Sequence, residues 1–180
     1  MKRIIVDIDN TLWDFGAVLW AHMRRLNSSV PEPMYWDKWD FWVEYLSERE
    51  FYSVVREIHI NQNHQNFSPY AEARDFLISL KDLGFSVIIA SHREKYTLNS
   101  TLNWLNTHEL IYDEVHLEND KSILFENSYA VIDDSPALLE KAERLGKVRT
   151  GLSHPWNIES GHPLFVNLNE VYRYIRNIGK

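Results

Sequence analysis

The chain has 180 residues, a hydrophobic fraction of 44% and a formal net charge of −7. This length allows one domain with an insertion or two small domains, and an acidic chain without a basic tail argues against duplex nucleic acid as a partner. Cysteine is absent, which excludes disulfides, thiolate metal sites and cysteine nucleophiles. No apolar stretch approaches the roughly 20 residues of a membrane span, and no signal peptide fits the first residues. We therefore expect a cytoplasmic protein without a membrane partner.

The first strand is the most informative element. Ile4-Ile5-Val6 is followed at once by Asp7-Ile8-Asp9. A short β-branched run predicts a buried parallel strand, and the carboxyl end of such a strand is where open α/β sheets bind their ligands. Like charges repel, so two carboxylates there need a cation or a shared proton, and Mg²⁺ is the simplest hard cation that oxygen ligands bind.

The alternation of strands and helices is interrupted once, over residues 14–68. Helical periodicity over 15–26, an aromatic segment over 35–46 and a helix opened by the capping box at 47–50 predict an all-helical cap domain, which the polar residues 61–66 close. Asp14 either caps the first helix or has a functional role. We expect most aromatic rings here to form the core of the cap, with one or two facing a ligand; the candidates are Trp13, Trp20, Tyr35, Trp36, Trp39, Phe41, Trp42 and Tyr45.

The remaining residues, 1–13 and 69–180, predict an α/β core domain. The expected elements are a helix that starts at Ser68-Pro69 and ends at Gly84, a strand over 85–90, a helix over 96–105, strands over 114–117 and 129–132, a helix from Ser135-Pro136 to Gly146, a strand over 148–150 and a helix over 166–178. Strands that alternate with helices imply a doubly wound, Rossmann-like parallel sheet.

Polar side chains follow several of these strands. They are Asp7, Asp9 and Thr11 after the first strand, Ser91, His92 and Arg93 after the second, Asp133 and Asp134 after a later one, and Lys121 near the start of a short predicted helix. The strand ends of a parallel sheet converge, so we expect these groups around one crevice. Carboxylates there would hold a cation, while hydroxyls and basic groups would hold an anion, which is the equipment of metal-assisted phosphoryl transfer.

These residues resemble, in their order, the four motifs of the haloacid dehalogenase (HAD) superfamily. Asp7 to Thr11 is similar to the D-x-D-x-T motif, Ser91 to the second motif, Lys121 to the third and Asp133-Asp134 to the fourth. The insertion lies where one class of these enzymes carries a helical cap. The first motif and the small cap are more narrowly similar to those of 5′(3′)-deoxyribonucleotidases, except that Asn10-Thr11 stands where those enzymes usually have Gly-Val.

The resemblance implies catalytic roles for Asp7 as nucleophile and Asp9 as general acid and base, with Ser91 and Lys121 on the phosphoryl oxygens. It implies Mg²⁺ bound by the Asp7 carboxylate, the Asp9 backbone carbonyl and Asp133, while Asp134 binds through water or pairs with Lys121. Thr11 is expected chiefly to order the loop, and His92 and Arg93 to contact substrate or cap; these three are secondary candidates for substrate binding.

The sequence therefore predicts a Mg²⁺-dependent phosphomonoester hydrolase that forms an aspartyl-phosphate and acts on a small phosphorylated substrate. A nucleoside monophosphate is the expected substrate, as for a 5′-nucleotidase. Another small phosphate, either a sugar phosphate or a polynucleotide 3′-phosphate end, is an alternative. A noncatalytic protein that binds a phosphorylated ligand on the same fold is a second alternative, against which the complete acidic and basic set argues. The segment 152–157 either borders the active site or is a plain loop.

Overall fold

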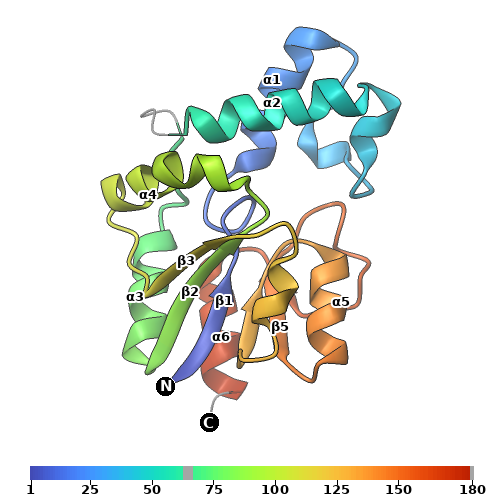
Figure 1. Cartoon of the computed structure of the whole chain (residues 1–180). Helices are drawn as coiled ribbons and strands as arrows, with labels where there is room; N and C mark the ends of the chain where they lie inside the picture. Colours follow the sequence, from blue (N-terminus) through green and yellow to red (C-terminus); the bar gives the residue numbers. More distant parts are fainter. Residues whose placement is uncertain (63–66, 179–180) are drawn as a thin grey trace.

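A six-stranded parallel sheet forms the centre of the protein in the computed structural model, which describes residues 1–62 and 67–178. Its order is β3-β2-β1-β4-β5-β6, so the first strand lies in the interior of the sheet (Figure 1). The strands are β1 (Lys2–Val6), β2 (Phe85–Ser91), β3 (Glu114–Leu117), β4 (Ala130–Ile132), β5 (Val148–Leu152) and β6 (Leu164–Phe165). Every pairing is parallel, which confirms the predicted α/β fold class.

The two faces of the sheet are both buried, as expected of a parallel sheet. Successive side chains of a strand point to opposite faces. In β1, Ile4 and Val6 belong to the larger apolar core, whereas Ile5 belongs to a smaller core on the other face. Helices α3 (Ala73–Asp82) and α6 (Leu168–Ile178) pack against the larger core. Helix α5 (Pro136–Arg144) covers the smaller core with Leu138 and Ala142.

The segment between β1 and α3 lies over the carboxyl ends of the strands (Figure 1). It contains α1 (Phe15–Leu26), the short 3₁₀ helices η1 (Pro33–Tyr35) and η2 (Phe41–Glu44), and α2 (Glu48–Ile60), with α1 packed against α2. The Asp14 carboxylate caps α1 by accepting a 3.0 Å hydrogen bond from the Ala17 amide, and Ser47 and Glu50 form the predicted capping box of α2. Of the polar segment 61–66, only residues 61 and 62 are among those described.

Short helices lie in the connections between β2 and β3 and between β3 and β4. The short 3₁₀ helix η3 (Lys95–Thr97) leads into α4 (Leu98–Thr107), which also packs against α2. The 3₁₀ helix η4 (Lys121–Leu124) follows β3 and carries Lys121 at its first position, where the sequence predicted the start of a short helix. The strand predicted over 114–117 is found with these bounds.

The predicted helix start at Ser68-Pro69 is wrong. Helix α3 begins at Ala73, because Pro69 forms an antiparallel bridge with Trp13 and the Tyr70 amide donates a 2.9 Å hydrogen bond to the Leu12 carbonyl. The chain is thus held extended beside the loop after β1. Strand β6 was also missed, because a strand of two residues is too short to show the alternation of apolar and polar side chains that predicts a strand. No helix in the described ranges is both long and apolar enough to cross a bilayer.

Candidate active site

Asp7, Lys121 and Asp133 form a buried charged cluster at the carboxyl ends of β1 and β4. The register aligns Val6 with Ile132, so the residues that follow these strands stand side by side. Lys121 Nζ lies 2.8 Å from Asp133 Oδ2 and also donates to Asp7 Oδ1. Burial alone would lower the pKa of Lys121, but the charges of Asp133 and Asp7 outweigh burial and raise it. The lysine is therefore an ammonium held against two carboxylates.

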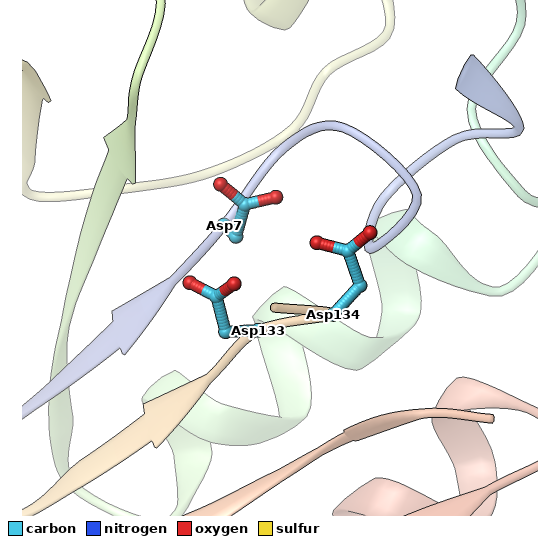
Figure 2. A group of neighbouring side chains, drawn as sticks. All are labelled: Asp7, Asp133 and Asp134. Carbon is cyan, nitrogen blue, oxygen red and sulfur yellow. The ribbon is translucent and has the colours of Figure 1, made fainter. Parts of the chain in front are cut away.

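A third carboxylate, that of Asp134, completes an acidic group with Asp7 and Asp133. One oxygen from each of the three side chains lies within 4.8 Å of the other two, and all three residues are buried. Figure 2 shows the side chains converging from the loop after β1 and the end of β4. Burial, together with Asp133 and Asp9 and against the charge of Lys121, raises the pKa of Asp7 to about 7. Burial and the charges of Asp7 and Asp133 raise the pKa of Asp134 well above its usual value.

This donor set fits a hard divalent cation. Three carboxylates face the single ammonium of Lys121, so additional positive charge would relieve their repulsion. Asp133 Oδ2 lies close to Lys121 but accepts no well-directed hydrogen bond from any described residue, which leaves a buried oxygen with free acceptor capacity. The other oxygen, Oδ1, accepts a 2.9 Å hydrogen bond from the Ser135 amide, which fixes the orientation of the carboxylate.

Asn10 connects the loop after β1 to Asp134. Its backbone is left-handed, with φ of 57°, a conformation that Asn and Gly tolerate best. The side chain donates a 3.1 Å hydrogen bond to Asp134 Oδ2 and accepts a 2.8 Å hydrogen bond from the Gly16 amide. The pairing of Asp134 with Lys121, one of the two expectations for this residue, is replaced by the contact with Asn10; the salt bridges of Lys121 go to Asp7 and Asp133.

The side chain of Asp9 accepts hydrogen bonds from neighbouring donors and is not part of the acidic group. Arg93 donates to it through Nε at 3.0 Å and Nη2 at 2.5 Å, and Trp13 Nε1 donates at 2.8 Å. His59 Nε2, from helix α2, lies 3.2 Å from Asp9 Oδ2. Burial by itself would raise the pKa of Asp9, but the nearby charges of Arg93 and His59, together with the hydrogen bonds from Arg93, hold it well below the usual range. Asp9 is therefore a carboxylate in this arrangement.

A cavity of about 600 Å³ opens from these carboxylates toward α1, η2 and α2. Charged and polar residues line its floor, including Asp7, Asp9, Lys121, Asp133 and Asp134. Aromatic rings line its other walls, namely Phe15, Trp36, Trp39, Phe41, Trp42, Phe51, Tyr52, Tyr96 and Trp156. Four of the candidate rings of residues 13–45 therefore reach the cavity, where we expected one or two. The 3₁₀ helix η2 and the turn before it direct Trp39, Phe41 and Trp42 toward it.

Comparison with known proteins gives a consistent result at the level of the fold. The structure is similar over 98% of both chains to a predicted phosphatase from Clostridium acetobutylicum, with a TM-score of 0.67 and 16% identity. It is similar to a HAD family hydrolase from Deinococcus radiodurans with bound phosphate and sodium, over 99% of this chain and 96% of that one, with a TM-score of 0.65 and 15% identity. A HAD-superfamily hydrolase from Ehrlichia chaffeensis matches over 100% of both chains, with a TM-score of 0.62 and 17% identity.

The chain has the fold of the haloacid dehalogenase superfamily. The likeness lies in the structure, because no protein-family model matches the chain and no curated protein matches it either. The fold that the resemblance of the four short motifs implied is thus confirmed.

The HAD fold brings most of the predicted site residues together. Ser91 is buried at the end of β2 and lines the cavity, and His92 lines it as an exposed side chain. Arg93 was expected to contact substrate or cap; its buried guanidinium binds Asp9 and, on the cap side, Gln62. Thr11 is fully buried and is not among the residues that line the cavity, so its place agrees with a role in ordering the loop rather than in binding substrate.

Several residues at the cavity were not singled out by the sequence patterns, and Trp156 and His59 are two of them. Trp156 lies in the segment after β5 that was left open as a site border or a plain loop; it lines the cavity and stacks on His154 at 4.4 Å. His59 belongs to a face of α2 with Tyr52, Val55 and Arg56. Their spacing of three and four residues was a usable signal, because it places these side chains on one side of the helix.

Proposed function

We propose that this protein is a Mg²⁺-dependent phosphomonoester hydrolase that acts through an aspartyl-phosphate on Asp7. The observation that carries the proposal is the convergence of the Asp7, Asp133 and Asp134 oxygens within 4.8 Å beside the Lys121 ammonium. Mg²⁺ would be held by these carboxylates and the Asp9 backbone carbonyl, and would supply positive charge to the phosphoryl oxygens. Lys121 and the Ser91 hydroxyl would bind the same oxygens from the protein side.

In this proposal the ester is hydrolysed in two steps, formation of the aspartyl-phosphate and its hydrolysis. A carboxylate oxygen of Asp7 attacks phosphorus, the bond from phosphorus to the ester oxygen breaks, and the departing oxygen takes a proton from Asp9. A water molecule then attacks the aspartyl-phosphate and gives its proton to Asp9, which releases phosphate and restores Asp7. The ion pair of Asp9 with Arg93 corresponds to its deprotonated form, so Asp9 takes up a proton and loosens this pair before the first step.

The aromatic cavity supports a nucleoside monophosphate as substrate. A flat base can stack between aromatic rings, and Trp42 and Trp39 line the cavity above the acidic floor. The volume of about 600 Å³ falls within the range typical of small-molecule sites. The resemblance of the first motif and the small cap to 5′(3′)-deoxyribonucleotidases points to the same class. Asn10, which stands where those enzymes usually have Gly, has a left-handed backbone conformation that Gly adopts equally well. This difference from those enzymes therefore changes the side chain but preserves the loop.

The test is a phosphate-release assay on the purified chain with Mg²⁺. The panel contains ribo- and deoxyribonucleoside 5′- and 3′-monophosphates, sugar phosphates, a 3′-phosphorylated oligonucleotide and p-nitrophenyl phosphate, and Asp7→Asn is the control for contaminating phosphatases. We expect the highest kcat/KM for a nucleoside monophosphate. Preference for a sugar phosphate would contradict the nucleotide assignment alone. No turnover of any ester, with tight binding of one of them, would favour the noncatalytic alternative.

A further inference from the structure

The hydrogen-bonding capacity of Asp9 is nearly filled from the core side. A carboxylate offers about four acceptor positions. Arg93 fills two and Trp13 fills a third, all with well-directed hydrogen bonds between 2.5 and 3.0 Å. The fourth neighbour is His59, which approaches from the cap and lies 3.2 Å from Oδ2 without forming a directed hydrogen bond. This side of Oδ2 is therefore the one where another molecule can reach Asp9.

His59 is itself held firmly, while its Nε2 finds no directed hydrogen-bond partner in residues 1–62 and 67–178. The residue is only 7% exposed, its ring stacks on Phe15 with centroids 5.4 Å apart, and its backbone carbonyl accepts a 2.7 Å hydrogen bond from Ser100 Oγ. Nε2 is buried and makes no directed hydrogen bond within the part of the chain that the structure describes. Buried polar atoms almost always have a partner, so an orphan at the wall of a cavity indicates a ligand atom that the protein alone does not supply.

His59 lies where the departing ester oxygen of a substrate would approach Asp9. His59 and Asp9 both line the cavity, His59 as part of helix α2 and Asp9 as part of the loop after β1. Helix α2 lies over the carboxyl ends of the strands (Figure 1). In the reaction proposed above, the departing oxygen lies within hydrogen-bond reach of Asp9, about 2.6–3.2 Å from it. With Arg93 and Trp13 on the other sides of the carboxylate, that oxygen approaches Oδ2 where His59 Nε2 faces it.

We propose that His59 is a substrate-contacting residue whose Nε2 hydrogen-bonds the departing oxygen of an alkyl phosphomonoester, such as a phosphorylated sugar or nucleoside. The inference rests on the proposed phosphatase function. It assigns to the cap a direct contact with the scissile bond, in addition to the contacts of its aromatic rings with the remainder of the substrate. Alkyl esters depend most on this contact, because their departing oxygen carries concentrated negative charge, whereas a nitrophenolate spreads its charge over the ring.

The experiment compares His59→Leu, His59→Gln and the wild type on an alkyl ester and on p-nitrophenyl phosphate. The control is His22→Gln, a cap histidine in α1 that is not among the cavity-lining residues. Loss of one hydrogen bond to developing charge predicts a fall of about tenfold or more in kcat/KM for the alkyl ester with His59→Leu, and a change below about threefold for p-nitrophenyl phosphate. His59→Gln, which keeps an N–H donor, should recover part of the alkyl activity.

Other outcomes overturn the inference. Equal losses on both esters would show that His59 supports the structure only, and unchanged rates on both would show that it contacts no substrate. Thermal melts accompany each assay; if His59→Leu does not fold, the ratio of the two activities is taken from His59→Asn, whose shorter side chain does not reach Asp9. A wild type that hydrolyses neither ester refutes the proposed function, and this inference with it. An active wild type with an insensitive His59 refutes this inference alone.

Discussion

The Asn10 side chain donates a 3.1 Å hydrogen bond to Oδ2 of Asp134 and so orients one of the three carboxylates of the acidic group. The same side chain accepts from the Gly16 amide at the start of α1. Because Asn10 has a φ of 57°, replacement by Gly removes both contacts without straining the backbone. A substitution at Asn10 therefore tests the contribution of its side chain to the acidic group without changing the conformation of the loop.

Asn10→Gly is expected to weaken Mg²⁺ binding by about tenfold or more, because residues that orient metal ligands typically contribute that much. Isothermal titration of the protein with Mg²⁺ or Mn²⁺ measures the effect without turnover. Asp14→Ala is the matched control: it removes a different hydrogen bond at the start of α1, should cost about 1 kcal/mol of stability, and should leave the metal affinity unchanged. Equal affinity in Asn10→Gly and wild type would contradict the role assigned to Asn10.

Removal of the metal should abolish turnover and lower thermal stability. The carboxylates of Asp7, Asp133 and Asp134 repel one another, and a bound cation relieves this repulsion only in the folded state. With Mg²⁺ at about 100 times its dissociation constant, we expect the Tm to rise by roughly 5–10 °C above that in EDTA. Differential scanning fluorimetry measures the shift. Full turnover in EDTA, or a tightly bound zinc ion in the purified protein, would refute the proposed metal chemistry.

Asp7→Asn should reduce kcat by at least about a thousandfold, because the amide that replaces the carboxylate is too weak a nucleophile to attack phosphorus. Asp9→Asn should also be impaired but should retain its fold and its ability to bind beryllium fluoride beside Asp7 as a phosphoryl mimic. Fluorine NMR of the two variants with beryllium fluoride and Mg²⁺ distinguishes them, with a bound signal expected only for Asp9→Asn. Near-normal turnover by Asp7→Asn would exclude covalent catalysis through this residue.

The cap aromatics should divide into rings that bind substrate and rings that hold the cap together. Trp39 is 51% exposed and lines the cavity, so Trp39→Ala should raise KM for nucleotides with little change in Tm or in hydrolysis of p-nitrophenyl phosphate. Trp36 is 2% exposed and stacks on Phe41 at 3.8 Å, so Trp36→Ala should cost about 3–5 kcal/mol and impair all substrates. Equal loss on all substrates with Trp39→Ala, without a change in Tm, would contradict a role in recognising the base.

Gly151 allows β5 to pass close to the backbone of Asp133. A Cβ at this position would lie 1.9 Å from the Asp133 carbonyl oxygen, so Gly151→Ala forces the two strands apart and displaces Asp133. We expect a loss of more than about 2 kcal/mol in urea unfolding together with weaker metal binding. Gly84→Ala, at a positive φ but in open space, should cost only about 1 kcal/mol and leave the metal site intact. Similar losses in both variants would show that the close approach is unimportant.

The sequence by itself determined the parallel sheet and the location of the site. The β-branched run before Asp7 and the apolar run before Ser91 are typical of strands that are buried on both faces, and the structure has strands at both places. Parallel pairing then places the residues after these strands at one edge, so the meeting of Asp7 with Asp133 followed from their positions in the sequence. The capping box at Ser47 was likewise local, since its hydrogen bonds join residues three apart.

Only the tertiary structure decided what surrounds these carboxylates. The pairing of Asp9 with Arg93 joins residues 84 apart in the chain, and the approach of His59 depends on how α2 lies across the sheet edge. The same holds for Trp156, which lines the cavity and whose ring lies 6.2 Å from that of Trp36 in the cap. The start of α3 was misplaced because the contact of Pro69 with Trp13 overrides the local helix signal. Contacts between distant segments depend on packing geometry, which local residue patterns do not encode.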